Sequence, residues 1–171
     1  MRSTKSWLAR QLLAVASVLV VTATQAADLV PEARYANLQP SGSRVELSQL
    51  GSSNQATVEQ NGLRQQLIQA QTGARNQALV QQSGAYNAAD VQQLGSGNNI
   101  ALEQSGRYNA AAMSQVGSAN QANVVQSGAY NQAYVGQYGQ GNQANVNQNG
   151  FGGTVTVQQY GNNMNATVNQ R

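Results

Sequence analysis

Amide side chains at a fixed spacing are the main chemical feature of this 171-residue sequence. Glutamine recurs at every eleventh position from Gln49 to Gln170, without exception. Glycine follows two residues after each of the first eleven glutamines, and asparagine usually follows five residues after. A primary amide both donates and accepts hydrogen bonds, and identical amides that lie on top of one another can therefore pair. The spacing predicts that these residues serve self-recognition.

The amides that we expect to stack, and the glycines that we expect in turns, recur through the whole repeat region. The predicted stacking ladder comprises Gln49, Asn54, Gln60, Gln71, Asn76, Gln82, Asn87, Gln93, Asn98, Gln104, Asn109, Gln115, Asn120, Gln126, Asn131, Gln137, Asn142, Gln148, Gln159 and Gln170. The predicted turn glycines are Gly51, Gly62, Gly73, Gly84, Gly95, Gly106, Gly117, Gly128, Gly139, Gly150 and Gly161. A buried amide without a partner costs about 1–3 kcal/mol, and repetition makes a polar interior tolerable because each amide meets a copy of itself.

Catalytic and metal-binding residue types are scarce. The chain has no histidine and no cysteine, which excludes Ser-His and Cys-His nucleophilic catalysis and soft metal sites. Glu59 and Glu103 share a strand position two coils apart, roughly 9.6 Å at the strand spacing, close to the separation in an inverting glycosidase. We expect nothing concave around them, and interpret them, with Glu46 and Asp90, as solvated charges that limit aggregation. We predict no enzyme activity, no cofactor and no metal.

The same pattern predicts the elements that must position the amides. In seven-residue segments such as 76–82 and 98–104, odd positions carry Asn, a small apolar residue, a Val-like residue and Gln, and even positions are mostly polar. This alternation predicts strands with one inward and one solvated face, joined by four-residue turns with glycine at the second position. The residue after each glutamine alternates between two types. The true repeat is therefore 22 residues, one strand-turn-strand-turn unit.

We predict an all-β fold, a β-solenoid of 22-residue coils in which two stacked parallel sheets form an amyloid-competent cross-β structure. Residue n lies over residue n + 22, at a strand spacing of about 4.8 Å. Ala and Val dominate a thin core, and the backbone and amide ladders must supply the remaining stability. With no proline between positions 41 and 171 and no capping segment, such a stack is expected to add further copies end to end.

The chain divides into three predicted parts. Residues 1–26 have a basic start, an apolar run and a small-residue cleavage site, which together are typical of a secretory signal peptide. Residues 27–42 lack the period and hold both prolines, as expected of a flexible leader. Residues 43–171 form one domain of six 22-residue units, the last truncated. Without the signal peptide, six arginines balance six carboxylates, and a basic surface for nucleic acid is absent.

A family resemblance rests on the repeat itself. The first unit reads Ser43-x5-Gln49-x-Gly51-x2-Asn54-x-Ala56-x3-Gln60, and the pattern continues through the repeat region. It resembles the repeat of the curlin family, the secreted subunits of curli, which are functional amyloid fibres of bacterial biofilms. The resemblance implies a structural protein that crosses the outer membrane and remains in extracellular, cell-surface fibres. The implied partners are further copies of the chain, the curli major subunit, the curli secretion channel with its accessory factors, and the cell surface.

Curlins are of two kinds, a major fibre subunit and a minor subunit that nucleates it at the cell surface. The chain resembles the minor subunit in its Gln170-Arg171 ending and in five further arginines after the signal peptide. Its central repeats, rich in Gln, Asn and Gly, suit the major subunit equally. We predict the nucleating role in biofilm formation and adhesion, with the major subunit as the alternative.

Departures from the pattern lie at the ends of the array. In the second unit Gln65 replaces Asn, and Gln69 takes an inward position where Val is usual, with Ile68 pointing outward. In the sixth unit Gly153 and Met164 replace Asn. We expect these changes to weaken the ladders locally, and we predict that unit six is associated with the cell surface or is a frayed terminal repeat.

A rival interpretation is a monomeric β-solenoid that binds a ligand on a regular outward array. The outward column that would carry such an array is irregular: Thr57, Leu79, Ala101, Asn123, Asn145 and Thr167. Calcium-binding repeats are disfavoured because the turns lack a regular aspartate. Tyr86, Tyr108 and Tyr130 align at intervals of 22, and are expected either to stack as a ribbon or, as we favour, to cover turns.

Overall fold

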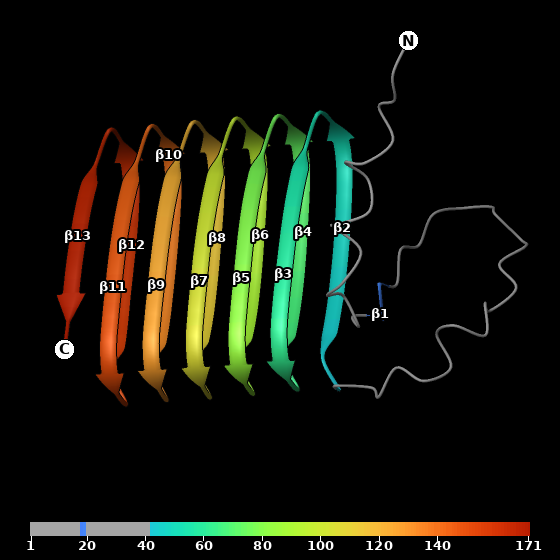
Figure 1. Cartoon of the computed structure of the whole chain (residues 1–171). Coiled ribbons are helices and arrows are strands. Elements are labelled where there is room, and N and C mark those ends of the chain that lie inside the picture. Colours follow the sequence, from blue (N-terminus) through green and yellow to red (C-terminus); the bar gives the residue numbers. More distant parts are fainter. Residues whose placement is uncertain (1–17, 20–41) are drawn as a thin grey trace, which may run out of the picture.

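The computed structural model describes residues 18–19 and 42–171 (Figure 1). The predicted signal peptide and leader lie outside the described residues, apart from Val18–Leu19 and Gly42. The strands are β1 (Val18–Leu19), β2 (Arg44–Ser52), β3 (Gln55–Leu63), β4 (Gln66–Ala74), β5 (Gln77–Ala85), β6 (Ala88–Ser96), β7 (Asn99–Arg107), β8 (Ala110–Ser118), β9 (Gln121–Ala129), β10 (Gln132–Gln140), β11 (Gln143–Phe151), β12 (Thr154–Asn162) and β13 (Asn165–Gln170).

The strands form two parallel sheets that face each other (Figure 1). The first sheet has the order β1-β2-β4-β6-β8-β10-β12, and the second has the order β13-β11-β9-β7-β5-β3. Neighbouring repeat strands are in register at 22 residues, as in the pairs Gln82 with Gln104 and Gln93 with Gln115. The predicted all-β solenoid with 22-residue coils is thereby confirmed. Across the described ranges, no helix is long and apolar enough to cross a bilayer.

The strands are longer, and the turns shorter, than predicted. The segment predicted as 76–82 corresponds to β5, which begins at Gln77 and continues through Gly84 to Ala85. Only Tyr86 and Asn87 separate it from β6. The prediction placed glycine inside a four-residue turn, whereas Gly84 pairs with Gly106 as part of the sheet. Gly84 changes the direction of the chain without interrupting the ladder. Its φ is +101°, a value that residues with a Cβ rarely adopt.

The core is a thin layer between the sheets. Its apolar part consists mainly of alanine and valine, with larger side chains at Leu67, Ile100, Leu102 and Met113. The glutamines and asparagines of the repeat lie at both margins of this layer, and Gln104 and Asn98 have no exposed surface. Alternation along each strand sends the remaining side chains to the outer faces.

Candidate functional site

Two columns of glutamine side chains run the length of the stack. In each column the Nε2 atom of one glutamine donates to the Oε1 atom of the glutamine one coil further along, at 2.5 to 3.0 Å. The column on the first sheet comprises Gln49, Gln71, Gln93, Gln115, Gln137 and Gln159. The column on the second sheet comprises Gln60, Gln82, Gln104, Gln126, Gln148 and Gln170. The structure therefore joins the twelve predicted glutamines into two continuous hydrogen-bonded chains.

The glutamines also connect the two sheets to each other. Besides its bond to Gln126, Gln104 Nε2 on β7 donates to the backbone oxygen of Ala88 on β6, at 3.1 Å. The same contact recurs from coil to coil, for example from Gln115 Nε2 to the oxygen of Asn99 at 3.0 Å. Each interior amide thus satisfies both of its protons, which a buried polar group requires to avoid a desolvation cost.

The asparagines lie immediately before the strands and hold the turns. The backbone N–H of Asn98 donates to Oδ1 of Asn76, one coil earlier, at 3.1 Å. Its Nδ2 donates to the oxygen of Leu94 at 3.5 Å and to the oxygen of Gly117, in the next coil, at 3.1 Å. The predicted pairing of asparagine side chains is present in this column, but the bonds to backbone groups could not be derived from periodicity. The asparagines therefore join each turn to the coils on both sides.

The substituted position Gln65 takes over only part of this role. Its Nε2 donates to the oxygens of Asn61 and Gly84, at 2.7 and 3.3 Å. Its Oε1 is buried and has no partner within the described structure. The longer side chain reproduces the donor function of asparagine, and its acceptor is left unpaired.

In the glycine columns, the backbones of successive coils approach each other closely. A Cβ atom on Gly106, whose φ is +109°, would lie 1.9 Å from the oxygen of Gly128 in the next coil. Equivalent approaches of about the same length recur along both columns, for example at Gly73 against Gly95. Glycine at these positions is therefore a requirement of coil spacing as well as of backbone conformation.

The glutamine columns have a direction, and the two ends of the stack consequently differ. At the first coil, Gln60 Oε1 is buried and finds no partner among the described residues. At the last coil, Gln170 accepts from Gln148, and its own Nε2 has no further glutamine to reach. One end thus presents amide acceptors and the other presents amide donors, and the two sets are complementary.

The backbone edges of the terminal coils are also open. In the second sheet, β3 and β13 are the outermost strands, and β12 is outermost in the first sheet. On its outer side β2 pairs, within the described ranges, with the two residues of β1, Val18 and Leu19. An open parallel strand offers unpaired N–H and C=O groups to another chain.

The outer faces carry shallow hollows in place of the flat surface that we expected. On the second sheet, Glu59, Gln81 and Glu103 line one of them. Gln81 Nε2, on the coil between the two carboxylates, donates to Glu59 Oε2 at 3.2 Å. The two glutamates thus lie on either side of a bridging amide, and the other residues that line this hollow are amides and Ser83.

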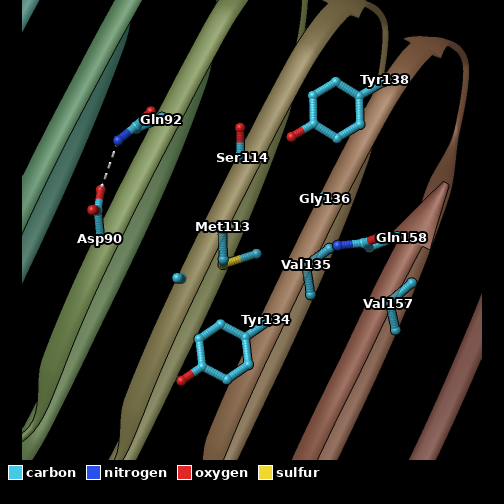
Figure 2. Close-up of a pocket in the computed structure, with 11 residues that line it drawn as sticks. Asp90, Gln92, Met113, Ser114, Tyr134, Val135, Gly136, Tyr138, Val157 and Gln158 are labelled. Atoms are coloured by element: carbon cyan, nitrogen blue, oxygen red, sulfur yellow. Dashed lines mark hydrogen bonds between the residues drawn. The ribbon is translucent and has the colours of Figure 1, made fainter. Parts of the chain in front are cut away.

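A second hollow lies over β6, β8, β10 and β12 on the first sheet (Figure 2). Figure 2 shows Asp90 and Gln92 on one side and the rings of Tyr134 and Tyr138 on the other. Asp90 Oδ1 accepts a bond from Gln92 Nε2 at 3.4 Å. The hollow arises because small side chains, including Gly136, line its floor. Its lining contains one carboxylate, that of Asp90, and two phenols.

Comparison with known families locates the repeat in the centre of the chain. Residues 95–128 and 117–150 match the curlin associated repeat. These matches support the curlin family. The matched residues cover about a third of the chain, and together with the β-solenoid fold they point to a structural protein. A comparison with curated proteins finds no match.

The curlin match falls where the amide columns are most regular. Residues 95–150 contain an uninterrupted set of glutamines and asparagines, whereas the substituted positions Gln65, Gly153 and Met164 lie outside it. As predicted, Gln69 points inward and Ile68 points outward. Sequence reasoning did not reveal that both amide atoms of Gln69 are unpaired, because this depends on the apolar side chains of Leu47 and Val91, which adjoin it in its column.

Proposed function

We propose that this chain is an extracellular curli subunit and acts as the minor subunit that nucleates the major subunit at the cell surface. The observation that supports this most is the first coil, where β3 is the outermost described strand of its sheet and Gln60 Oε1 has no partner among the described residues. An incoming chain with the same repeat has a matching donor at each glutamine position. It can add as a further coil by strand addition.

Head-to-tail addition of this kind produces a filament. The acceptor end of one chain faces the donor end of another, and a contact between two different surfaces that does not close on itself generates an open fibre. Each added coil pairs its backbone with the strand before it and buries its own glutamines and asparagines. The regular columns of residues 87–148 provide the register for this growth.

The remaining parts of the proposal concern location. The signal peptide at residues 1–26 directs export, the curli channel and its accessory factors carry the chain across the outer membrane, and unit six, residues 153–171, retains it at the cell surface. Gly153 and Met164 carry no side-chain amide, and unit six therefore contributes less to the ladders than the central units do.

The nucleating role is tested by seeding. A small amount of the assembled mature chain is added to monomeric curli major subunit, and the lag before thioflavin fluorescence rises is measured. We expect the lag to disappear. A seed carrying Gln60→Leu removes the open acceptor and should restore part of the lag, whereas Glu59→Gln, outward on the same strand, serves as the matched control. If the unmodified seed leaves the lag unchanged, the chain is an ordinary fibre component and does not nucleate the major subunit.

A further inference from the structure

Three tyrosines form a continuous aromatic ribbon along one edge of the stack. Tyr86, Tyr108 and Tyr130 occupy the same turn in successive coils, each with a left-handed φ of 57° to 60°. Their ring centroids lie 4.8 and 4.9 Å apart, with planes inclined by 12° and 11°. Each ring is about two-fifths exposed, from 39% to 46%. The phenol groups are therefore stacked on one another and still accessible to solvent.

The ribbon is closed at both ends by residues of the same chain. The Arg64 guanidinium lies 5.6 Å from the centroid of the Tyr86 ring, and its Nη1 donates to the Tyr86 hydroxyl at 3.3 Å. At the other end Phe151 contacts Tyr130 at 5.2 Å with its ring tilted by 57°. The next position in the column is Gly152. Within the column, the ribbon is consequently flanked at each end by a residue other than tyrosine.

We propose that this tyrosine ribbon is a site of oxidative cross-linking, in which a one-electron oxidant of the haem peroxidase class, using hydrogen peroxide, couples neighbouring rings into dityrosine. Each of two phenols loses one electron and its hydroxyl proton to give a phenoxyl radical. A carbon–carbon bond forms between their ortho carbons, and the two hydrogens on those carbons move to the oxygens as the rings regain aromaticity. The two electrons and two protons released reduce one hydrogen peroxide to two waters.

The geometry favours this reaction because coupling requires two rings to be adjacent when both are oxidised. The 22-residue register places equivalent ring edges beside each other, and the partial exposure of each ring lets an oxidant reach the hydroxyl group. Tyr138 and Tyr160 form a second stacked pair, with centroids 4.9 Å apart. Tyr134 is equally exposed, at 45%, but stacks on no ring of the described chain. It is an internal negative control.

The product would join successive coils covalently. A bond between Tyr86 and Tyr108 connects the turn after β5 to the turn after β7, and a bond between Tyr108 and Tyr130 connects the next pair. Each bond joins two coils of the same chain, and Arg64 and Gly152 occupy the flanking positions of the column. The cross-link therefore stabilises the coil stack without changing the size of the subunit.

The test uses the assembled mature chain with Tyr138→Phe and Tyr160→Phe, which leaves the ribbon as the stacked tyrosine group. After treatment with peroxidase and hydrogen peroxide, we expect dityrosine fluorescence and the loss of two hydrogen atoms per link by mass spectrometry. Trypsin cuts after Arg75 and Arg107, and a Tyr86–Tyr108 link is seen as peptide 76–107 joined to peptide 108–171. Denaturing gels should show monomer.

The decisive variant adds Tyr108→Phe to this background. Phenylalanine preserves the aromatic stack but separates the two remaining phenols of the ribbon by two coils, and the dityrosine signal should be lost while the cross-β fibre reflection is retained. The proposal is overturned by any of three results: no dityrosine in the parent, dityrosine that persists after Tyr108→Phe, or links that run mainly through Tyr134 or between chains.

Discussion

At the scale of the residue, a buried glutamine makes three hydrogen bonds, and each serves a different part of the structure. Gln104 donates to Gln126 and accepts from Gln82, which connects three coils, and it donates to Ala88, which connects the two sheets. A valine or leucine in this position would fill the space, but it would specify no register. The amide column is polar and directional, and it therefore disfavours a stack that is shifted by one residue.

The first prediction concerns this column. Gln104→Ala leaves Gln82 Nε2, Gln126 Oε1 and the Ala88 oxygen each short of a partner, and each buried unpaired group costs about 1–3 kcal/mol. We expect a strong increase in the lag before fibre formation, and a further increase with Gln126→Ala added. The matched control is Gln92→Ala, whose side chain is exposed on an outer face. Equal lags for Gln104→Ala and the unmodified chain would argue against ladder-driven assembly.

The second prediction separates close approach from backbone strain. Gly106→Ala places a Cβ 1.9 Å from the Gly128 oxygen, which the backbone cannot accommodate at the observed coil spacing. Gly97→Ala also changes a glycine with positive φ, but its Cβ would meet nothing within 4 Å, and Ala119 already occupies the same column at φ of 54°. We expect Gly106→Ala to abolish regular fibres and Gly97→Ala to cost only about 1–2 kcal/mol. Fibre diffraction and denaturant stability distinguish them, and similar behaviour of both variants would refute the close-approach argument.

At the scale of the element, the alternation of side chains was enough to predict the strands, their inward faces and their stacking at 22 residues. The face on which a residue lies depends only on its position in the strand, and a buried set such as Ala78, Val80 and Gln82 is therefore visible in the sequence. The ends of the strands could not be predicted in this way, because glycine usually marks a turn. Here Gly84 remains in the ladder through contact with Gly106, a tertiary effect that no local pattern reveals.

The direction of the amide columns was equally inaccessible to sequence reasoning. A column in which every glutamine donates forward has the same composition as one in which every glutamine donates backward. Which of the two directions the column takes depends on which backbone oxygen lies within reach of the second Nε2 proton. For Gln104 this is the Ala88 oxygen. This requires the distance between the two sheets, which is a property of the assembled fold.

The third prediction concerns β4, where an interior strand carries an unsatisfied polar group. Gln69 is buried, and neither its Nε2 nor its Oε1 has a partner in the described structure. Met113 occupies the same column two coils further on, which shows that the core accepts a methionine of similar length there. We expect Gln69→Met to stabilise the folded chain by about 1–3 kcal/mol, because it removes an unpaired amide.

Denaturant unfolding of the soluble chain measures this change in stability. The control is Gln71→Met, two residues further along the same strand, where the amide accepts from Gln49 and donates to Gln93. That variant is expected to be destabilised. If Gln69→Met is also destabilised, the Gln69 amide has partners that the structure does not show, and β4 is not a point of weakness.

At the scale of the whole molecule, the two ends of the stack differ in more than the direction of the amides. The first coil presents Asn54 and Gln60, whereas the last coil presents Gly153 and Met164 at the positions of asparagine. The backbone of unit six nevertheless stays in the ladders, since β12 keeps nine residues in register with β10 and β13 keeps six with β11. The Gly153 and Met164 amides still donate to the side chains of the preceding asparagines. The expected weakening thus affects side-chain bonds only: unit six lacks the Nδ2 bonds that asparagines make within their own turns, as Asn142 does to Tyr138, and those that they offer to a further coil.

The last prediction tests whether unit six serves attachment. Truncation after Gly152 moves the end of the stack back by one coil, where Gln137 and Gln148 present the same amides that Gln159 and Gln170 presented before. The shortened chain should therefore still give cross-β fibres with the strand-spacing reflection. Arg171, a positive group that can meet an anionic cell surface, is lost together with the rest of residues 153–171.

We expect the truncated protein to appear in the culture medium, where an immunoblot of washed cells and of the medium measures its distribution. Arg171→Gln in the full-length chain is the matched control, because it removes the charge and keeps the coil: retention of this variant would assign attachment to the surface of unit six rather than to its terminal charge. Retention of the truncated chain on the cells would instead show that unit six is a frayed terminal repeat, since the five remaining units would then carry both assembly and attachment.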